Sequence, residues 1–407
     1  ATGRRADTVD RLALGFIALA ALYLLVGSAI VPSAPSSLSV RLLAFRQDAG
    51  FVLVLLGARH APLPADFLQR AGRAAIAVAA VVGAVCIFET LDASGWNHFV
   101  VSTIRYTRYE VGILHAKIPN YDDIRIYGTI GGGQIVRAGS VFVSALTCGF
   151  YLVLGFALAL ERTVRERTSP AILLALPVIG AGLLLTQTRS AILAGVIVTI
   201  LAFAPAAGRR RSWRTQLGLL MAILAIVAIP AVVSTGLTKR VTGALNNTDS
   251  SSLAHASAFW DGLHAIARQP LGYGLGTSAG TGQRFQTAGS SVVVPENDYL
   301  QVGVELGVIG TLLFVALTVA VVVHLRRAAR RWASGPLAAT MAAAAGLMVA
   351  AWVLQTWTDV TVSWTMWGMA GASLGVARTQ LAGAPAGLAG PRRAAHRGEV
   401  TTQPLTA

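Results

Sequence analysis

The stretch YLQVGVELGVIGTLLFVALTVAVVVH, residues 299–324, decides the class of protein. Between Glu305 and His324 it carries no charged side chain. A helix of this length crosses the hydrocarbon core of a bilayer, which is about 30 Å thick. Nine further apolar runs have about the same length: Leu12–Val31, Leu42–Gly57, Ala74–Leu91, Ser140–Leu160, Ala171–Gln187, Ala191–Gly208, Gln216–Thr235, Leu337–Trp357 and Val360–Ala377. We therefore expect an all-α, polytopic membrane bundle of about ten transmembrane helices.

The composition agrees with this expectation. Of the 407 residues, 54% are hydrophobic and only 13% are charged, whereas a soluble domain typically carries about 25% charged residues. A cytosolic enzyme and a secreted domain are excluded. We expect one membrane domain over residues 1–381, and a disordered tail over residues 382–407, which are rich in Ala, Gly, Pro and Arg. The second span is the weakest, because Arg46, Gln47 and Asp48 interrupt it, and its alternative is a short or tilted span that begins near Ala49.

The basic residues predict the orientation. With the N-terminus inside, the inner loops and termini hold 21 of the 33 Lys and Arg residues, and the whole net charge of +15 falls on that side. The positive-inside rule then places both termini in the cytoplasm and the loops 92–137 and 236–297 outside the plasma membrane. This excess is expected to contact anionic lipid headgroups, and it does not indicate binding to nucleic acid.

The polar residues concentrate on the predicted outer side. A short hairpin, Thr186–Ser190, joins two spans. In the larger loop, Asp249 and the following serines provide N-cap chemistry for a helix that ends at Pro270. This helix has one apolar face and one polar face, so we expect it to lie on the membrane surface or over a cavity. The glycines of PLGYGLG (270–276) favour a tight re-entrant turn.

Several motifs in order resemble one family. PLGYGLG (270–276), a polar gap and ENDYLQVGVELGVIG (296–310) are similar to the O-antigen ligase and polymerase superfamily of bacterial surface-polysaccharide enzymes. TQTRSAILAG (186–195) and IVRAGSVFVSALTCGFYL (135–152) extend the resemblance over roughly residues 130–380.

The resemblance implies a GT-C-like membrane glycosyltransferase. Such enzymes transfer a glycan from undecaprenyl pyrophosphate to a hydroxyl of a glycan or lipid acceptor, without a metal, a cofactor or a nucleotide sugar. By motif, Arg189 and Arg137 would bind the pyrophosphate or the glycan. Glu296 stands where many members have a histidine as catalytic base, and His255 stands where many have an arginine.

The residue chemistry is consistent with this implication. Arginine stabilises phosphate charge through a planar, bidentate fork, and a carboxylate can accept the proton of an acceptor hydroxyl. Glu296 is therefore our catalytic candidate, with capping of the eighth helix as the competing interpretation. The candidate substrate-binding residues are Arg189, Arg137, His255, Asn297, Arg268 and Arg284. For Asn297 a capping role is a stronger hypothesis than substrate binding. For Arg268 and Arg284 the alternative to substrate binding is that they are only solvated loop residues.

Two other functions stay open. A peptidoglycan polymerase of the shape, elongation, division and sporulation type also has ten spans and a long external loop after the seventh. A lipid-linked sugar transporter or flippase would predict inverted repeats, which the sequence does not display. Ligase and polymerase are not distinguished. Trp352, Trp357, Trp364 and Trp367 are predicted to form an interfacial belt.

Overall fold

The computed structural model describes residues 7–31, 33–35, 37–64, 66–112, 123–124, 126–130, 133–165, 169–203, 250–278, 281–282, 285, 293–332 and 334–383. The predicted seventh span, Gln216–Thr235, and the tail from residue 384 lie outside these ranges.

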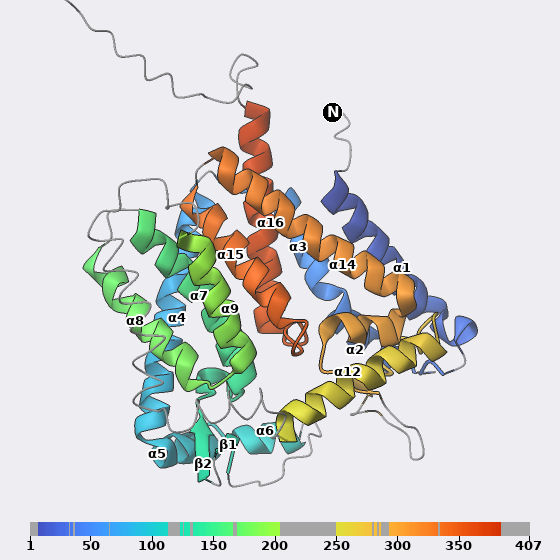
Figure 1. Ribbon diagram of the computed structural model, residues 1–407, viewed down its shortest axis with the longest axis horizontal. Coiled ribbons are helices and arrows are strands. Elements are labelled where there is room, and N and C mark those ends of the chain that lie inside the picture. The colour runs from blue at the N-terminus through green and yellow to red at the C-terminus, as the bar shows by residue number, and fades with distance from the viewer. Residues whose placement is uncertain are drawn as a thin grey trace, which may run out of the picture.

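The described helices form a membrane bundle. Four of them are long and apolar enough to cross a bilayer: α1 (Thr8–Ile30), α4 (Phe67–Leu91), α7 (Ala145–Arg165) and α14 (Asp298–Trp332). Alongside them lie α8 (Pro170–Leu185), α9 (Arg189–Phe203), α15 (Gly335–Ala350) and α16 (Val360–Gly383) (Figure 1). The predicted all-α fold is confirmed. Each predicted span in the described ranges overlaps a helix, although several ends differ by five to eight residues, as for Ala74–Leu91 against α4 and Tyr299–His324 against α14.

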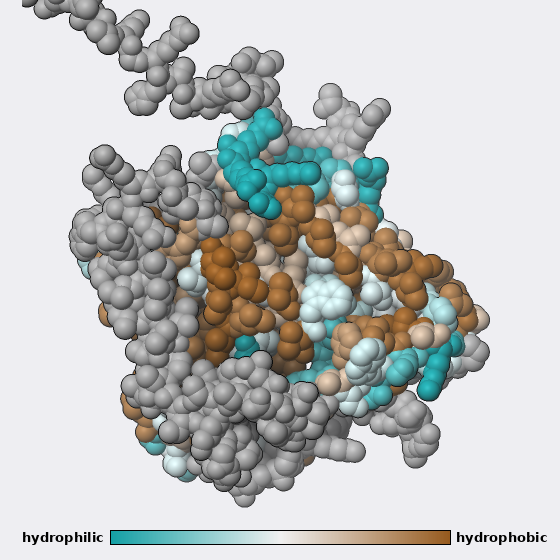
Figure 2. All heavy atoms as spheres, in the orientation of Figure 1, coloured by the Kyte–Doolittle hydropathy of each residue, from teal (hydrophilic) through white to brown (hydrophobic). Residues whose placement is uncertain are grey.

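The outer surface of the bundle matches a lipid environment. Leu25, Leu174 and Leu312 are 71%, 70% and 64% exposed. Figure 2 shows hydrophobic residues across the middle of this face, with hydrophilic residues gathered toward its two ends. Such a belt would be unfavourable in water, and lipid tails remove its exposure.

The second predicted span is two helices. The polar run Arg46–Asp48 ends α2 (Leu38–Asp48), and α3 (Gly50–His60) begins after Ala49, whose φ of -120° and ψ of -16° leave the helical region. Only α3 packs along α16, where Gly371 brings the two backbones together: a Cβ there would lie 2.2 Å from the carbonyl oxygen of Leu55. The prediction of one continuous helix over Leu42–Gly57 was therefore wrong, because the polar run stops the helix, and the alternative of a short span that begins near Ala49 is confirmed.

The predicted belt of tryptophans is wrong for two of its four members. Trp357 and Trp367 are 2% and 1% exposed, and their rings pack edge to face at 5.7 Å. Trp367 also packs 4.9 Å from Phe51. Trp352 and Trp364 are exposed, as a belt requires. Their position in the span predicted Trp357 and Trp367 at the membrane interface, but both rings are buried by packing against neighbouring helices.

Helix α14 is broken where the glycine-rich turn meets it. Gly307 has φ 71° and ψ −171°, which interrupts the helix. The carbonyls of Val304 and Glu305 accept hydrogen bonds from Tyr273 N (2.7 Å) and Gly274 N (3.0 Å) of the turn instead of from their own helix. Gly272, Gly274 and Gly276 all have positive φ, so the re-entrant turn predicted for this segment is confirmed.

One end of the bundle, which we call the loop face, carries the elements outside the spans. They are α5 (Ala93–His98), a π-helix (Phe99–Thr103), α6 (Tyr106–Gly112), the strands β1 (Ile126–Ile130) and β2 (Gly133–Arg137), a 3₁₀ turn (Ser140–Phe142) and α12 (Ser250–Arg268) (Figure 1). The strands pair antiparallel, with Ile126 opposite Arg137. The sequence analysis did not predict this hairpin.

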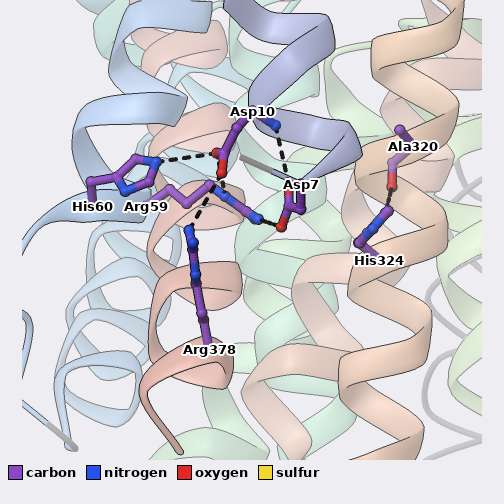
Figure 3. Close-up of polar contacts among 7 residues, drawn as sticks. All are labelled: Asp7, Asp10, Arg59, His60, Ala320, His324 and Arg378. Carbon is purple, nitrogen blue, oxygen red and sulfur yellow. Dashed lines mark hydrogen bonds and ion pairs between the residues drawn. The ribbon is translucent and has the colours of Figure 1, made fainter. Parts of the chain in front are cut away.

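At the opposite end of the bundle, an ion-pair cluster connects three helices (Figure 3). Asp10 of α1 accepts from Arg59 Nε of α3 at 2.8 Å and from Arg378 Nη1 of α16 at 3.3 Å. Arg59 also pairs with Asp7, and His60 Nε2 lies 3.1 Å from Asp10. The cluster joins the first span, the third helix and the last span at one point.

The two cysteines of the chain face each other between α4 and α7. Cys86 Sγ and Cys148 Sγ lie 3.4 Å apart, at hydrogen-bond distance, and both residues are fully buried thiols that form no disulfide. They fill space in the core as small apolar side chains.

Candidate active site

The Thr186–Ser190 hairpin and Arg137 form one unit on the loop face. Helix α8 ends at Leu185 and α9 begins at Arg189, so the predicted hairpin is confirmed. Arg137, at the end of β2, donates from Nε to the carbonyl of Thr186 and from Nη2 to Oγ1 of Thr188, both at 3.2 Å. Two segments that the sequence analysis singled out separately are thereby brought together.

A buried acid holds the turn that follows Arg137. Glu89 of α4 is 6% exposed, and its Oε2 accepts from the backbone N–H groups of Gly139 (3.0 Å) and Ser140 (2.7 Å). Ala138 N donates to the carbonyl of Leu185 at 3.1 Å. These bonds fix Arg137 relative to the hairpin through the backbone on its C-terminal side.

Arg189 occupies the first position of α9 and is half-buried. The N-terminus of a helix carries partial positive charge and orphan N–H donors, which favour a bound anion. A guanidinium at that position adds a full positive charge. The hairpin therefore presents the electrostatics of a phosphate site, with Arg137 beside it.

The second group of residues lies on α12 and at the entry to α14. His255 Nδ1 of α12 contacts Glu296 Oε2, and the two contacting atoms are shielded from solvent although the side chains are 35% and 40% exposed. Helix α12 is held against the start of α14 at Gly262, where a Cβ would lie 3.0 Å from Pro295. The structure thus joins two candidates that are distant in the sequence.

The cap of α14 is Asn297. Its Oδ1 accepts from Tyr299 N (2.8 Å) and Leu300 N (3.1 Å), and its Nδ2 donates to the carbonyl of Trp352 at 2.7 Å. Asn297 is 2% exposed. The capping hypothesis for Asn297 is confirmed, and the competing interpretation of Glu296 as the cap is wrong, because the neighbouring amide satisfies these N–H groups.

A cavity of about 930 Å³ lies beside the polar face of α12. Asp261, His264 and Arg268 line it from the helix, and Tyr273 and Thr277 line it from the glycine-rich turn. The expectation that this helix lies over a cavity is confirmed, and Arg268 faces that cavity. Arg284 lies outside the described residues.

The sequence analysis missed a buried polar network behind the turn. Glu305 of α14 is fully buried, and its carboxylate accepts from Gly276 N and Ser278 N, both at 3.0 Å. Asp48 of α2 accepts from Gln301 Nε2 at 3.0 Å, and its carboxyl interacts with that of Glu305. Glu305 and Asp48 stand within predicted apolar runs, and this position could have indicated the network, because acidic residues inside membrane spans are rarely without a role.

Comparison with known proteins supports the resemblance of the middle of the chain to one family. Residues 171–315 match the family model described as O-antigen ligase. No curated protein matches the chain. The matched segment contains the Thr186–Ser190 hairpin, α12, the glycine-rich turn, Glu296 and the kink of α14. It confirms the resemblance to the O-antigen ligase superfamily.

The matched segment is similar to membrane glycosyltransferases of the O-antigen ligase and polymerase type, which act in polysaccharide biosynthesis. Proteins of this type work on a lipid-linked glycan donor and an acceptor in the membrane. Among the described residues, no group of three or more His, Cys, Asp or Glu side chains is arranged to hold a metal ion.

Proposed function

We propose that this protein transfers a glycan from undecaprenyl pyrophosphate to an acceptor hydroxyl at the loop face, on the outer side of the plasma membrane. The acceptor oxygen attacks the anomeric carbon of the donor sugar. The bond from that carbon to the phosphate oxygen breaks, and the lipid pyrophosphate leaves with the electron pair. The proton of the hydroxyl passes to a general base of the protein.

The contact between His255 and Glu296 is the observation that carries the proposal. A carboxylate at Nδ1 favours the tautomer with the proton on Nδ1 and leaves Nε2 as the acceptor. A carboxylate also stabilises the imidazolium that forms when Nε2 takes a proton. We assign the general base to this pair, in which Glu296 either takes the proton itself or orients His255.

The leaving group needs positive charge. Arg189 at the N-terminus of α9 is assigned to the pyrophosphate, where preorganised donors stabilise developing charge. Arg137 supports it by fixing the hairpin through Thr186 and Thr188. The match of residues 171–315 to the O-antigen ligase model supports the donor class.

Glycan transfer from a purified lipid-linked donor tests the base. We expect Glu296→Gln and His255→Gln each to lower the rate by roughly a hundredfold or more, because general base catalysis contributes about that much. The double variant should be little worse than either single variant, since residues that act as one unit are not additive. Glu296→His should recover part of the activity.

The comparison is made at matched amounts of folded protein, with Ala256→Gln as a control at an exposed neighbouring position of α12. Full turnover by Glu296→Gln would remove Glu296 from the mechanism. Loss of activity in Glu296→Gln together with full turnover by His255→Gln would assign the general base to the carboxylate of Glu296 without His255.

A further inference from the structure

The cavity beside α12 is elongated along the helix. Ala254, Ala258, Asp261, Ala265 and Arg268 line it from the helix. At 1.5 Å per residue this row is about 21 Å long. Ala254 directly precedes His255, and Val294, which also lines the cavity, lies two residues before Glu296. This end of the cavity is therefore the one nearest to the His255–Glu296 pair.

The opposite wall is closely packed at the glycine-rich turn. It is formed by the connection from α1 to α2 and by the glycine-rich turn. A Cβ on Gly274 would lie 2.4 Å from Cβ of Ala34, and one on Gly276 would lie 2.9 Å from Cγ1 of Val40. Glu305 holds the same turn from behind through Gly276 N and Ser278 N. The cavity is therefore preformed, as binding sites usually are.

The lining mixes donors, acceptors and ring faces. Asp261 and Ser257 bond to each other at 3.3 Å, and His264, Arg268 and Thr277 add further polar groups. Tyr273 and Phe285 contribute aromatic surface. A sugar chain has hydroxyls around the edges of its rings and apolar C–H groups on their faces, so both kinds of surface find partners. An acyl chain would leave the charged groups of the wall unpaired in an apolar environment, which is costly.

We propose that this cavity binds the acceptor glycan over several sugar units, with its terminal hydroxyl at the His255–Glu296 pair. The proposal rests on the glycosyl transfer argued above. It makes the protein selective for acceptor length, because each further sugar in the cavity adds contacts until the cavity is filled.

Acceptors of graded length test it. Oligosaccharides released by mild acid from the host's own lipid-linked glycans are separated by size, and transfer to each is measured with the full-length protein in lipid nanodiscs. The KM for the acceptor should fall with each added sugar and then level off, with kcat changing little. Binding of the same oligosaccharides without donor should tighten in parallel.

Variants of the lining should reduce the preference for length. Asp261→Asn and His264→Gln should each lower the ratio of kcat/KM between the longest and the shortest acceptor by about three- to tenfold, the range that one hydrogen bond provides. Ala258→Phe should reduce that ratio by filling the cavity. Ala267→Gln is the matched control, because Ala267 is exposed on α12 and does not line the cavity.

The outcomes separate the two proposals. Transfer with a KM that is independent of acceptor length would overturn the glycan cavity and leave the transferase intact. A KM that follows the length of the acceptor's acyl chains instead would also overturn it, in favour of a lipid. Length-dependent binding without transfer to any acceptor would support the cavity and contradict the proposed transferase.

Discussion

Arg137 and Arg189 occupy neighbouring places. The guanidinium of Arg137 is engaged with the backbone of Thr186 and the hydroxyl of Thr188. Replacing it would disturb the hairpin as well as remove a charge. Arg189 stands at the first position of α9, where its charge adds to the partial positive charge of the helix N-terminus.

We expect Arg189→Ala to lower kcat/KM for the lipid-linked donor by about a hundredfold or more, the cost of losing one preorganised donor to the charge that develops. Arg189→Lys should keep only part of the activity, because lysine keeps the charge and loses the bidentate fork. Arg108→Ala is the control, an exposed arginine on α6 at the same face. Near-normal transfer by Arg189→Ala would reduce Arg189 to an interfacial anchor.

Individual candidate residues could be predicted from the sequence, whereas the contacts between them could not. Arg137 and the hairpin were recognised separately, as were His255 and Glu296. Their pairings depend on distances across the bundle, and local patterns contain no such information. Asn297 was assigned correctly as a cap because capping is a local interaction.

Helices were predicted well where their signals are local. N-cap chemistry before Ser250 and the stop at Pro270 delimit α12 correctly. Apolar length gives the end of α4 at Leu91 and the start of α16 at Val360, but it misses the polar first turns of α4 and the last turns of α16. The polar run Arg46–Asp48 signalled the break at Ala49, which was the alternative start of the second span. The hairpin β1–β2 was missed, because it lies in a polar loop without an alternating apolar pattern.

The break in α14 provides a test at the scale of the element. At Gly307 the backbone adopts a conformation that is essentially restricted to glycine, which costs another residue about 1–3 kcal/mol. A Cβ there would also lie 2.3 Å from the carbonyl oxygen of Pro270. We expect Gly307→Ala to lower the melting temperature in detergent and to weaken transfer, since the turn and α12 would shift.

Gly57→Ala in α3 is the matched control. Nothing lies within 4 Å of a Cβ at that position, and alanine is preferred over glycine in a helix by roughly 0.5–1 kcal/mol. Its melting temperature should be unchanged or raised. If Gly307→Ala behaves in the same way, the bonding between α14 and the glycine-rich turn does not determine stability.

At the scale of the whole molecule, the Asp10 cluster connects the first and last spans. We expect Asp10→Asn to destabilise the protein by on the order of 2 kcal/mol, below the about 3–5 kcal/mol typical of a fully buried pair, because water reaches Asp7 and His60. The exposed pair of Arg70 and Asp66 is the control, and Asp66→Asn should change the melting temperature little. Equal effects of the two variants would show that burial of the cluster adds nothing.

The orientation of the bundle is a further prediction. Because the predicted inner loops and termini carry the whole net charge of +15, we expect the loop face to lie outside the cell. An impermeant thiol reagent on intact cells should label Ala256→Cys on α12, and should leave Gln69→Cys and Ser212→Cys unlabelled. Labelling of Ser212→Cys without lysis would invert the assigned orientation.

The packing of Cys86 against Cys148 makes that experiment simple. These are the only two thiols of the chain, and both are fully buried between α4 and α7. A bulky, charged maleimide therefore has no route to either sulfur while the bundle is folded. The unmodified protein is therefore expected to remain unlabelled and serves as the control. Labelling of each introduced cysteine can be measured without first replacing Cys86 and Cys148.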